Sequence, residues 1–391
     1  MKIVEVANKK TVRDFLYLPL KIYKNEQCWI RPLDRDIEST FNPSKNKHFR
    51  NGECIRWLLI KDTGEVIGRI AAFINEKTVN KGNDQPTGGI GFFECINDQD
   101  AANTLFDQSK TWLEEKGIEA MDGPINFGDR NEWWGLLVDG YDREPNYKSA
   151  YNPPYYRELF ENYGFQVYYK QFTYARKVMD PLSEKLHIKA DQIRKNPKYR
   201  FEYLDINKLE KYTEYLREVY NKAWAGHKNV PKLTLPQAKT VIKQMKPIID
   251  PKILYFGFYE DEPVAIFIMI PEMNQVFKYV NGKMNLLGIL KFLYHHKIAK
   301  TNRKMLGIIF GIVPEHQGKG VDGAIIMASR DVVQETYLRY EDFEMNWIGD
   351  FNPKMTRIVE QVGSYLAKTH ITYRYLFDRK KEFKRHPMVN V

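Results

Sequence analysis

The fold is decided by residues 305–323, which read MLGIIFGIVPEHQGKGVDG. The unbroken apolar run at 305–313 predicts a buried strand, and the periodic segment at 323–337 predicts a helix after it. The turn between them holds three glycines and Lys319, so backbone N–H groups can converge there beside the partial positive charge of a helix N-terminus. Such a turn can bind an anion such as phosphate, although a plain strand-to-helix connection has the same pattern. Its spacing matches neither the Walker loop nor the dinucleotide-binding GxGxxG motif.

The elements around this turn follow an order that occurs twice in the chain. In the second half, a hairpin at 253–270 precedes the strand at 305–313. In the first half, a hairpin at 56–74 precedes a strand at 88–96 and a helix at 101–116. Strand–turn–helix units combined with hairpins predict the α/β (α+β) class. We therefore expect two tandem domains, each a mixed, mostly antiparallel sheet flanked by helices, rather than one large α+β domain of unrelated parts.

The boundary between the two domains is expected where Pro181 and Pro197 enclose a polar helical stretch. This gives a first domain at 1–178, a linker at 179–198 and a second domain at 199–391. Single elements that the pattern predicts are a helix broken at Pro19, a strand at 120–126, a helix at 353–366 and a closing strand at 371–377.

Composition and charge narrow the classes of partner. The 391 residues carry 60 lysines and arginines against 50 aspartates and glutamates, a formal net charge of +10. This surplus favours nucleic acid, the cytoplasmic face of a membrane, or a polyphosphate cofactor. Three scattered cysteines, with no CxxC pair and no zinc spacing, exclude a disulfide scaffold and a zinc module, and no metal is expected. The sequence shows no signal peptide and no apolar run of membrane-spanning length, so we expect a cytoplasmic protein.

The glycine turn resembles the acyl-CoA-binding turn of the GCN5-related N-acetyltransferases (GNATs). That family has Gln/Arg-x-x-Gly-x-Gly/Ala after a strand and grips the CoA diphosphate with backbone amides; Gln317, Lys319 and Gly320 fit. Asp322 departs from the pattern, because a carboxylate repels a diphosphate unless it caps the helix and turns aside. Val359 stands where the family often has a thiolate-protonating tyrosine, which leaves that acid unassigned. The residues that the resemblance assigns to the cofactor are Val313, Gln317, Gly318, Lys319, Gly320, Val321, Asp322, Gly323 and Asn352.

A wider set of motifs carries a second resemblance. In chain order these are Phe15 to Leu33, Gly68-Arg69-Ile70-Ala71-Ala72, Gly91-Phe92-Phe93-Glu94, Asp122-Gly123-Pro124, Gly140-Tyr141-Asp142 and Tyr151-Asn152-Pro153-Pro154-Tyr155-Tyr156. With the glycine turn they resemble the YghO-like family of tandem acyltransferase-fold proteins, which includes bacterial ceramide synthases. The resemblance implies transfer of an acyl group from a CoA thioester to a primary amine, with a sphingoid base as one candidate. The first half has an acidic segment at 95–100 in place of the glycine turn, so only the second half is expected to bind acyl-CoA.

Acyl transfer to an amine requires a group that removes a proton, because an ammonium ion with a pKa of about 10 cannot attack a thioester. The candidate bases are His316 in the turn, Glu344 on the strand beside the expected cleft, and Glu94 at the matching strand end of the first half. Each could instead be a surface or hydrogen-bonding residue. The expected substrate contacts are Trp133, Trp134 and Tyr155, although paired tryptophans also pack the seam between domains.

Residues 286–300 read LLGILKFLYHHKIAK, an apolar part followed by a cationic part. A helix on a membrane surface or beside an acyl chain has this pattern, and so does a core helix with a basic C-terminal end. A peripheral contact with the anionic inner face of a membrane is therefore left open. His295 and His296 do not converge as a metal pair, because adjacent residues on a helix point apart.

Two other functions are compatible with the sequence. Tandem acyltransferase-fold proteins include aminoacyl-tRNA-dependent transferases, and a charge of +10 suits tRNA, but the chain has no dense basic-aromatic stripe, so nucleic acid is not favoured. Asp322 and Val359 could instead mark a catalytically inactive acyl-CoA-binding protein. The favoured partners are a CoA thioester and an amine substrate.

Overall fold

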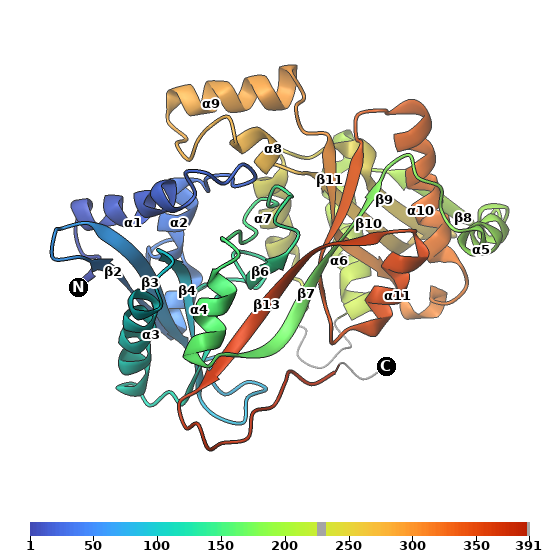
Figure 1. Ribbon diagram of the computed structural model, residues 1–391. Coiled ribbons are helices and arrows are strands. Elements are labelled where there is room, and N and C mark those ends of the chain that lie inside the picture. Colours follow the sequence, from blue (N-terminus) through green and yellow to red (C-terminus); the bar gives the residue numbers. More distant parts are fainter. Residues whose placement is uncertain (225–231, 389–391) are drawn as a thin grey trace.

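The computed structural model describes residues 1–224 and 232–388, and their strands form one continuous sheet (Figure 1). In spatial order the sheet consists of β1 (Lys2–Glu5), β2 (Gly52–Ile60), β3 (Val66–Asn75), β4 (Thr87–Cys95), β5 (Ala120–Gly123), β13 (Tyr365–Leu376), β7 (Gln166–Lys177), β12 (Asp342–Gly349), β11 (Lys304–Ile312), β10 (Glu262–Pro271), β9 (Leu254–Tyr259) and β8 (Tyr199–Tyr203), while β6 (Leu136–Asp139) pairs with β13. Most neighbours are antiparallel, and β4–β5 and β11–β12 are parallel pairs. The expected fold class is confirmed.

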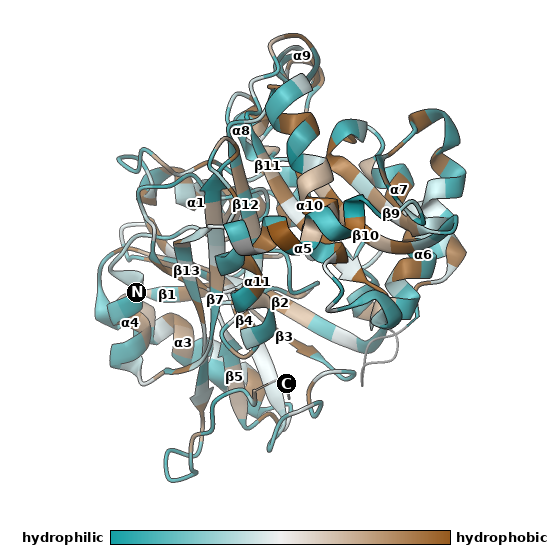
Figure 2. Cartoon of the chain, turned by 90° about the vertical axis from the view of Figure 1, so that its right-hand side faces the viewer, coloured by the Kyte–Doolittle hydropathy of each residue, from teal (hydrophilic) through white to brown (hydrophobic). Residues whose placement is uncertain are grey.

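Helices cover the sheet around two separate apolar cores, one in each half. Their bounds are α1 (Lys9–Ile22), α2 (Asp34–Thr40), α3 (Gln99–Glu114), α4 (Tyr156–Tyr163), α5 (Glu184–Arg194), α6 (Leu209–Trp224), α7 (Leu235–Met245), α8 (Asn274–Phe277), α9 (Leu286–Leu293), α10 (Val321–Asp331) and α11 (Pro353–Gln361). In Figure 2 brown gathers on strands such as β9 and β10, whereas β7 and β13 carry many hydrophilic residues; the helices show both teal and brown turns, as expected where one face of each helix packs on a sheet. The exception is α9, which stands away from the body in both views.

The two halves exchange strands. β7 comes from the first half of the chain, but it pairs along β12 in the second half. β13 ends the chain, but it lies between β5 and β7 and pairs with both. The division at residues 179–198 stays a prediction, because the sheet itself is interlocked across it.

Each half contains a wedge where two parallel strands diverge. In the second half, β11 and β12 pair only from Lys304–Asp342 to Gly307–Met345. In the first half, β4 and β5 pair only from Thr87–Ala120 to Gly89–Asp122. Beyond these pairs the strands separate, and we call the two openings the second-half wedge and the first-half wedge.

Three local expectations about element boundaries are wrong, each for a physical reason. α1 is not broken at Pro19. Pro19 has no N–H to donate to the carbonyl of Phe15, and the guanidinium of Arg69 donates to that carbonyl instead. The strand expected at 120–126 ends at Gly123, before a proline. The helix expected at 353–366 ends at Gln361, since Gly363 takes the left-handed conformation at φ 74° and the closing strand already begins at Tyr365.

Candidate active site

The second-half wedge opens into a cavity of about 430 Å³, a volume typical of ligand-binding pockets. Its wall is mostly apolar, with side chains from β11, β12, α10 and α11. The apolar lining includes Ile308, Phe310, Ile326, Val333, Met345 and Met355. Polar groups enter from three arginines, Arg130, Arg176 and Arg330, and from Asn346 and Asn352. The cavity can therefore hold a long apolar group with cations at its border.

The glycine turn (residues 317–323) connects β11 to α10, as the sequence predicts. Gly318 and Gly320 have φ angles of 73° and 98°, which a residue with a Cβ rarely adopts. None of the N–H groups of residues 318–323 donates a hydrogen bond to a described residue. The Gln317 side chain turns back and donates to the carbonyl of Ile312 at 2.9 Å. The turn therefore presents unpaired amide donors at the N-terminus of α10, next to the strand that lines the cavity.

Helix α5 lies against this turn, which sequence reasoning missed. A Cβ on Gly320 would lie 2.9 Å from the carbonyl oxygen of Lys189, and one on Gly323 would lie 3.1 Å from the Cβ of Ala190. Both glycines are thus needed for the close approach of α5, besides any role toward an anion. α5 also brings the exposed Lys189 next to the turn, as a second cation beside Lys319.

Asp322 does not cap the helix. Gly320 is the N-cap residue of α10 and makes no side-chain capping bond, and Asp322 is the second helical residue. Its carboxylate lies half-buried in the first turn, where it interacts favourably with the helix dipole but opposes an anion bound to the amides.

Asn352 and Val359 both line the cavity. Asn352 is the N-cap of α11, and its side-chain oxygen accepts from the N–H of Met355 at 3.4 Å. Val359 is 1% exposed and packs with Tyr174 and Ile348. The cavity wall beside α11 is therefore apolar at the point where the resemblance would place a tyrosine.

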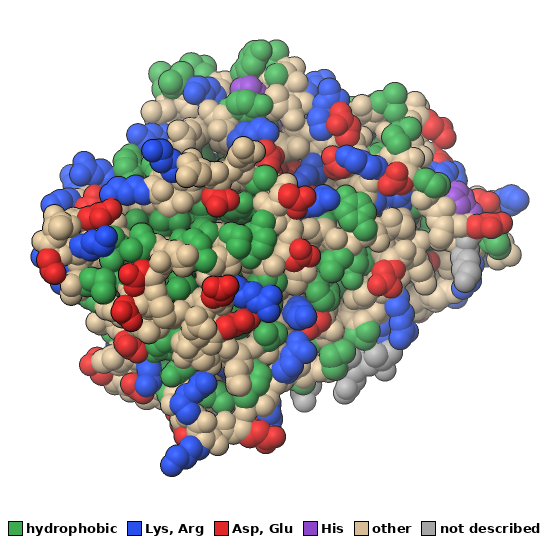
Figure 3. Space-filling view, in the orientation of Figure 1, with side chains coloured by type: hydrophobic (Ala, Val, Ile, Leu, Met, Phe, Trp, Pro, Cys, Tyr) green, Lys and Arg blue, Asp and Glu red, His purple; other side chains and the backbone are tan. Residues whose placement is uncertain are grey.

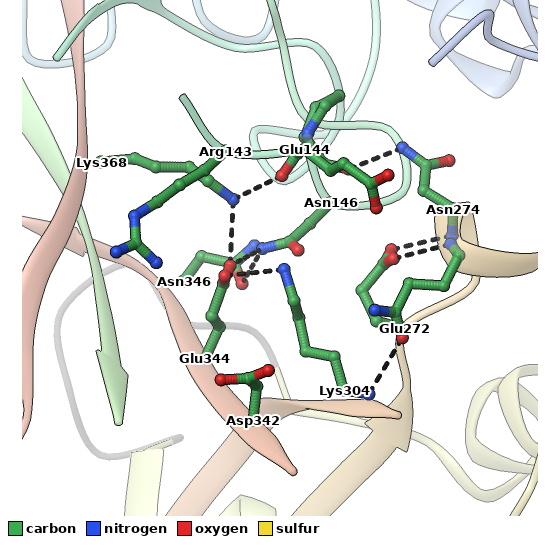
Figure 4. Close-up of polar contacts among 12 residues, drawn as sticks. Arg143, Glu144, Asn146, Glu272, Asn274, Lys304, Asp342, Glu344, Asn346 and Lys368 are labelled. Carbon is green, nitrogen blue, oxygen red and sulfur yellow. Dashed lines mark hydrogen bonds and ion pairs between the residues drawn. The ribbon is translucent and has the colours of Figure 1, made fainter. Parts of the chain in front are cut away.

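Glu344 lies in a buried charge network between the halves (Figure 4). Its carboxylate lies 2.7 Å from Lys304 Nζ and 3.1 Å from Lys368 Nζ, and it accepts from Asn146 Nδ2 at 2.7 Å. Burial alone would raise the pKa of Glu344, but the two lysines outweigh it and lower this pKa to about 2. Glu344 does not line the cavity, and a carboxylate of this pKa is a weak base. The geometry favours a structural ion pair.

The same network holds the loop at residues 143–148, the seam loop, which belongs to the first half. Glu272 follows β10 and accepts from the backbone N–H of Tyr147 at 2.7 Å. Asn274 donates to the carbonyl of Pro145 at 2.8 Å, and Lys368 donates to the carbonyl of Glu144 at 2.8 Å. Figure 4 shows these side chains around the loop, with Lys304 of β11 and Glu344 of β12 beside them. Sequence reasoning missed Glu272, because nothing local marks a lone glutamate after a strand.

Glu94 occupies the first-half wedge and borders a small cavity of about 90 Å³. It accepts from Tyr23 at 2.7 Å and from Tyr156 at 2.8 Å, and Arg69 lies 3.2 Å away. Burial raises the pKa of Glu94, and Arg69 opposes that rise. Trp133 lines the same cavity, so the structure brings these two predicted residues together.

A third, narrow cavity of about 20 Å³ lies between the two wedges. It shares Arg130, Asn346 and Trp347 with the large cavity, and it shares Trp133, Ser149 and Ala150 with the small one. Trp134 lines it and donates to Tyr169 at 2.7 Å, whereas Tyr155 lines none of the three and donates to the carbonyl of Cys95 at 2.7 Å. The cavities form a series across the seam. His370, missed by sequence reasoning, lines the narrow one, and burial lowers its pKa to about 4.

His316 lies away from this series. Its Nδ1 is 2.6 Å from the Tyr199 hydroxyl and its ring packs on Tyr259, at the β8–β9 side of the sheet. Burial and then Lys319 lower its pKa. Among the described residues no cluster of three His, Cys, Asp or Glu side chains could hold a metal ion. No helix within 1–224 and 232–388 has the length and apolar character needed to cross a bilayer.

The sheet order and the two wedges define the class of fold: the chain has the fold of tandem GNAT proteins. A tandem GNAT protein from the clavulanic acid biosynthesis pathway aligns with 96% of this chain and 98% of its own, with a TM-score of 0.53 and 9% identity. A GCN5-related glucosamine N-acetyltransferase region of a fungal multi-domain β-N-acetylglucosaminidase aligns with 96% of this chain and 38% of that one, with a TM-score of 0.55 and 11% identity.

Two curated bacterial proteins are similar over nearly the whole length. The bacterial ceramide synthase of Caulobacter vibrioides is 25% identical over 95% of this chain and 97% of its own. Protein YghO of Escherichia coli is 24% identical over 94% of this chain and 93% of its own. No family model matches the chain.

Proposed function

We propose that the protein is a CoA-dependent N-acyltransferase, in which the second-half wedge holds the thioester arm of acyl-CoA. The observation that carries this proposal is the mostly apolar cavity of about 430 Å³ between β11 and β12, together with the turn that follows β11, whose amides donate to no described residue. The apolar end of the acyl-CoA arm fits the cavity, and the diphosphate at its other end fits the turn.

The glycine turn is the proposed seat of the diphosphate. The N–H groups of residues 318–323 and the dipole of α10 favour an anion, and Lys319 and Lys189 add two full charges. Asp322 opposes binding, so the affinity is expected to be modest and sensitive to salt.

The proposed acceptor is a lipid-like primary amine, such as a sphingoid base, that reaches the thioester across the seam. The series of cavities supports a second, elongated substrate entering from the first-half wedge, where Trp133 and Glu94 lie. The name of the Caulobacter relative points to the same class of substrate.

In the reaction the ammonium group first loses a proton, and its nitrogen then forms a bond with the thioester carbonyl carbon. The C–S bond breaks, and the second nitrogen proton goes to the thiolate, which leaves as the thiol of CoA. The proposed proton acceptor is Glu94, which lines the cavity of the first-half wedge and whose pKa burial raises. Holding the two substrates side by side supplies much of the rate.

Calorimetry with CoA and palmitoyl-CoA tests the proposal. We expect saturable binding that Lys319→Glu weakens about tenfold, with a loss that shrinks at high salt. Val359→Trp, which fills the cavity, should weaken binding equally at all salt concentrations. Lys10→Glu, an exposed charge reversal on α1, is the matched control and should change nothing. Absence of binding to both ligands by the unaltered protein would refute the assignment.

A second candidate is an acyl-CoA-binding protein without turnover. It is supported by the large cavity itself, which no carboxylate or imidazole of the described residues lines. Sphinganine mixed with the palmitoyl-CoA complex separates the two: release of one CoA per acylated amine supports the enzyme, and binding without release supports the second candidate.

A further inference from the structure

The connection between β10 and β11 is much longer than the pairing of these strands requires. The two strands are antiparallel neighbours, which a short hairpin can join, but here 32 residues, 272–303, lie between them. They form α8, α9 and the π-helical turn η4 (Tyr294–Ile298), and α9 projects from the body of the molecule (Figure 1). Connections of this length with ordered structure of their own are usually functional.

The wide face of α9 and η4 that points outward is apolar. Only a narrow strip faces the protein: Gly288 and His296 are buried, and Phe292 stacks on Phe277 with ring centroids 5.6 Å apart. Seven of the nineteen exposed large hydrophobic side chains of the described chain fall within residues 286–298. They are Leu286 at 76%, Leu287 at 60%, Ile289 at 42%, Leu290 at 56%, Leu293 at 45%, Tyr294 at 53% and Ile298 at 73% exposed. We call these seven side chains the apolar patch.

The surroundings of the apolar patch are cationic. The exposed charges on the connection are Lys278, Lys283, Lys291, Lys297, Lys300 and Arg303. Its single acidic residue, Glu272, is 1% exposed and lies in the seam network. Green and blue side chains accordingly stand together at the top of Figure 3.

We propose that the apolar patch inserts into the interface of an anionic phospholipid bilayer, with the surrounding lysines on the headgroups. Residues 286–298 span roughly 20 Å as a helix, which suits a segment lying along the interface. Charge complementarity decides against a second copy of this chain, because a symmetric contact would set each ring of cations against the same ring. Each cation near an anionic surface adds to the attraction.

Both ends of the connection are fixed in the seam. Glu272 at its start holds the seam loop, and Lys304 directly after it pairs with Glu344. A bilayer bound by α9 therefore lies at a fixed position relative to the seam, beside which the proposed acceptor enters. This last step rests on the proposed function, whereas the membrane contact itself does not.

Co-sedimentation of the full chain with vesicles tests the proposal. We expect binding to phosphatidylcholine vesicles that contain phosphatidylglycerol, weaker binding to phosphatidylcholine alone, and a decline with salt. Leu287→Glu with Leu290→Glu should weaken binding at least tenfold, and Lys291→Glu with Lys300→Glu should remove the preference for anionic lipid. Tyr203→Glu with Ile206→Glu, two exposed apolar positions at the end of β8 and just after it, is the control and should bind like the unaltered protein.

Three outcomes overturn the proposal: no binding to anionic vesicles, equal binding by the double-leucine variant, or a dimer in light scattering that the double-leucine variant converts to a monomer. The double-leucine variant should keep its palmitoyl-CoA affinity. If the unaltered protein does not bind CoA, that result would count against the proposed function and not against the membrane contact.

Discussion

Replacing Glu344 by glutamine is expected to destabilise the protein by about 3–5 kcal/mol at pH 7, because it leaves two ammonium groups buried without a counter-charge. Glu344 is 2% exposed, so solvent screens little of the interaction. A shift of its pKa from an ordinary 4.5 to about 2 corresponds to about 3 kcal/mol. Burial also lowers the pKa of Lys368, so this lysine depends on the carboxylate to stay charged.

The pH dependence has a defined direction. Because the pKa of Glu344 is lower in the folded than in the unfolded state, its stabilising effect is present above about pH 4.5 and is lost as the pH falls toward 2. The difference in unfolding free energy between the unaltered protein and Glu344→Gln should therefore be roughly constant between about pH 5 and about pH 7, and it should shrink below about pH 4.5.

Urea unfolding followed by fluorescence of the seven tryptophans measures this difference. Glu344→Gln with Lys368→Met removes one of the two unpaired cations and should regain much of the lost stability. Glu218→Gln, which breaks an exposed ion pair with Lys222 on α6, is the control and should cost less than about 1 kcal/mol. A stable Glu344→Gln protein that has lost acyl transfer would refute the reasoning and make Glu344 the base.

Two further predictions concern the turn and the sheet. Asp322→Asn removes the carboxylate beside the amides of α10 and should tighten CoA binding about three- to tenfold at low salt, measured by calorimetry; weaker or unchanged binding would contradict the proposed diphosphate seat. Residues 1–178 and 179–391 expressed separately should each lack a strand in the interior of its sheet and stay unfolded by circular dichroism. Co-expression should restore a folded complex, and an independently folded half would show that the exchange is dispensable.

The strand–turn–helix unit around the glycine turn could be predicted because its evidence is local. The apolar run gives β11, the glycines give the turn and the period of the next segment gives α10. The confirmed class follows from such units repeated along the chain. The approach of α5 to Gly320 could not be predicted, because a glycine that admits a neighbouring helix and a glycine that admits a ligand look identical in sequence.

The seam network could not be predicted from the sequence, for a different reason. Glu344 contacts Asn146, nearly two hundred positions earlier, and Lys368, a strand later. Burial and pairing decide whether a carboxylate is a base or a structural ion, and both depend on contacts that no local pattern records. His316, with the best intrinsic pKa for a base, lies instead at the β8–β9 side of the sheet.

For the segment at 286–300, the hydrophobic pattern alone does not determine whether the helix is buried or exposed. A core helix and an interfacial helix share the same apolar run and basic end, and only the neighbours distinguish them. Here the inward strip consists of Gly288, Phe292 and His296, spaced four residues apart, and the leucines lie on the other side.

The strand exchange also accounts for the shape of the second-half wedge. β12 pairs with β7 from Asp342 to Gly349, but with β11 only as far as Met345. A strand cannot follow two diverging neighbours, so β12 leaves β11 because it stays on β7. The first-half wedge is built alike: all four residues of β5 pair with β13, whereas β4 pairs with only the first three. In each half the strand lent by the other half holds the wedge open, so the cavity proposed to bind acyl-CoA depends on both halves of the chain.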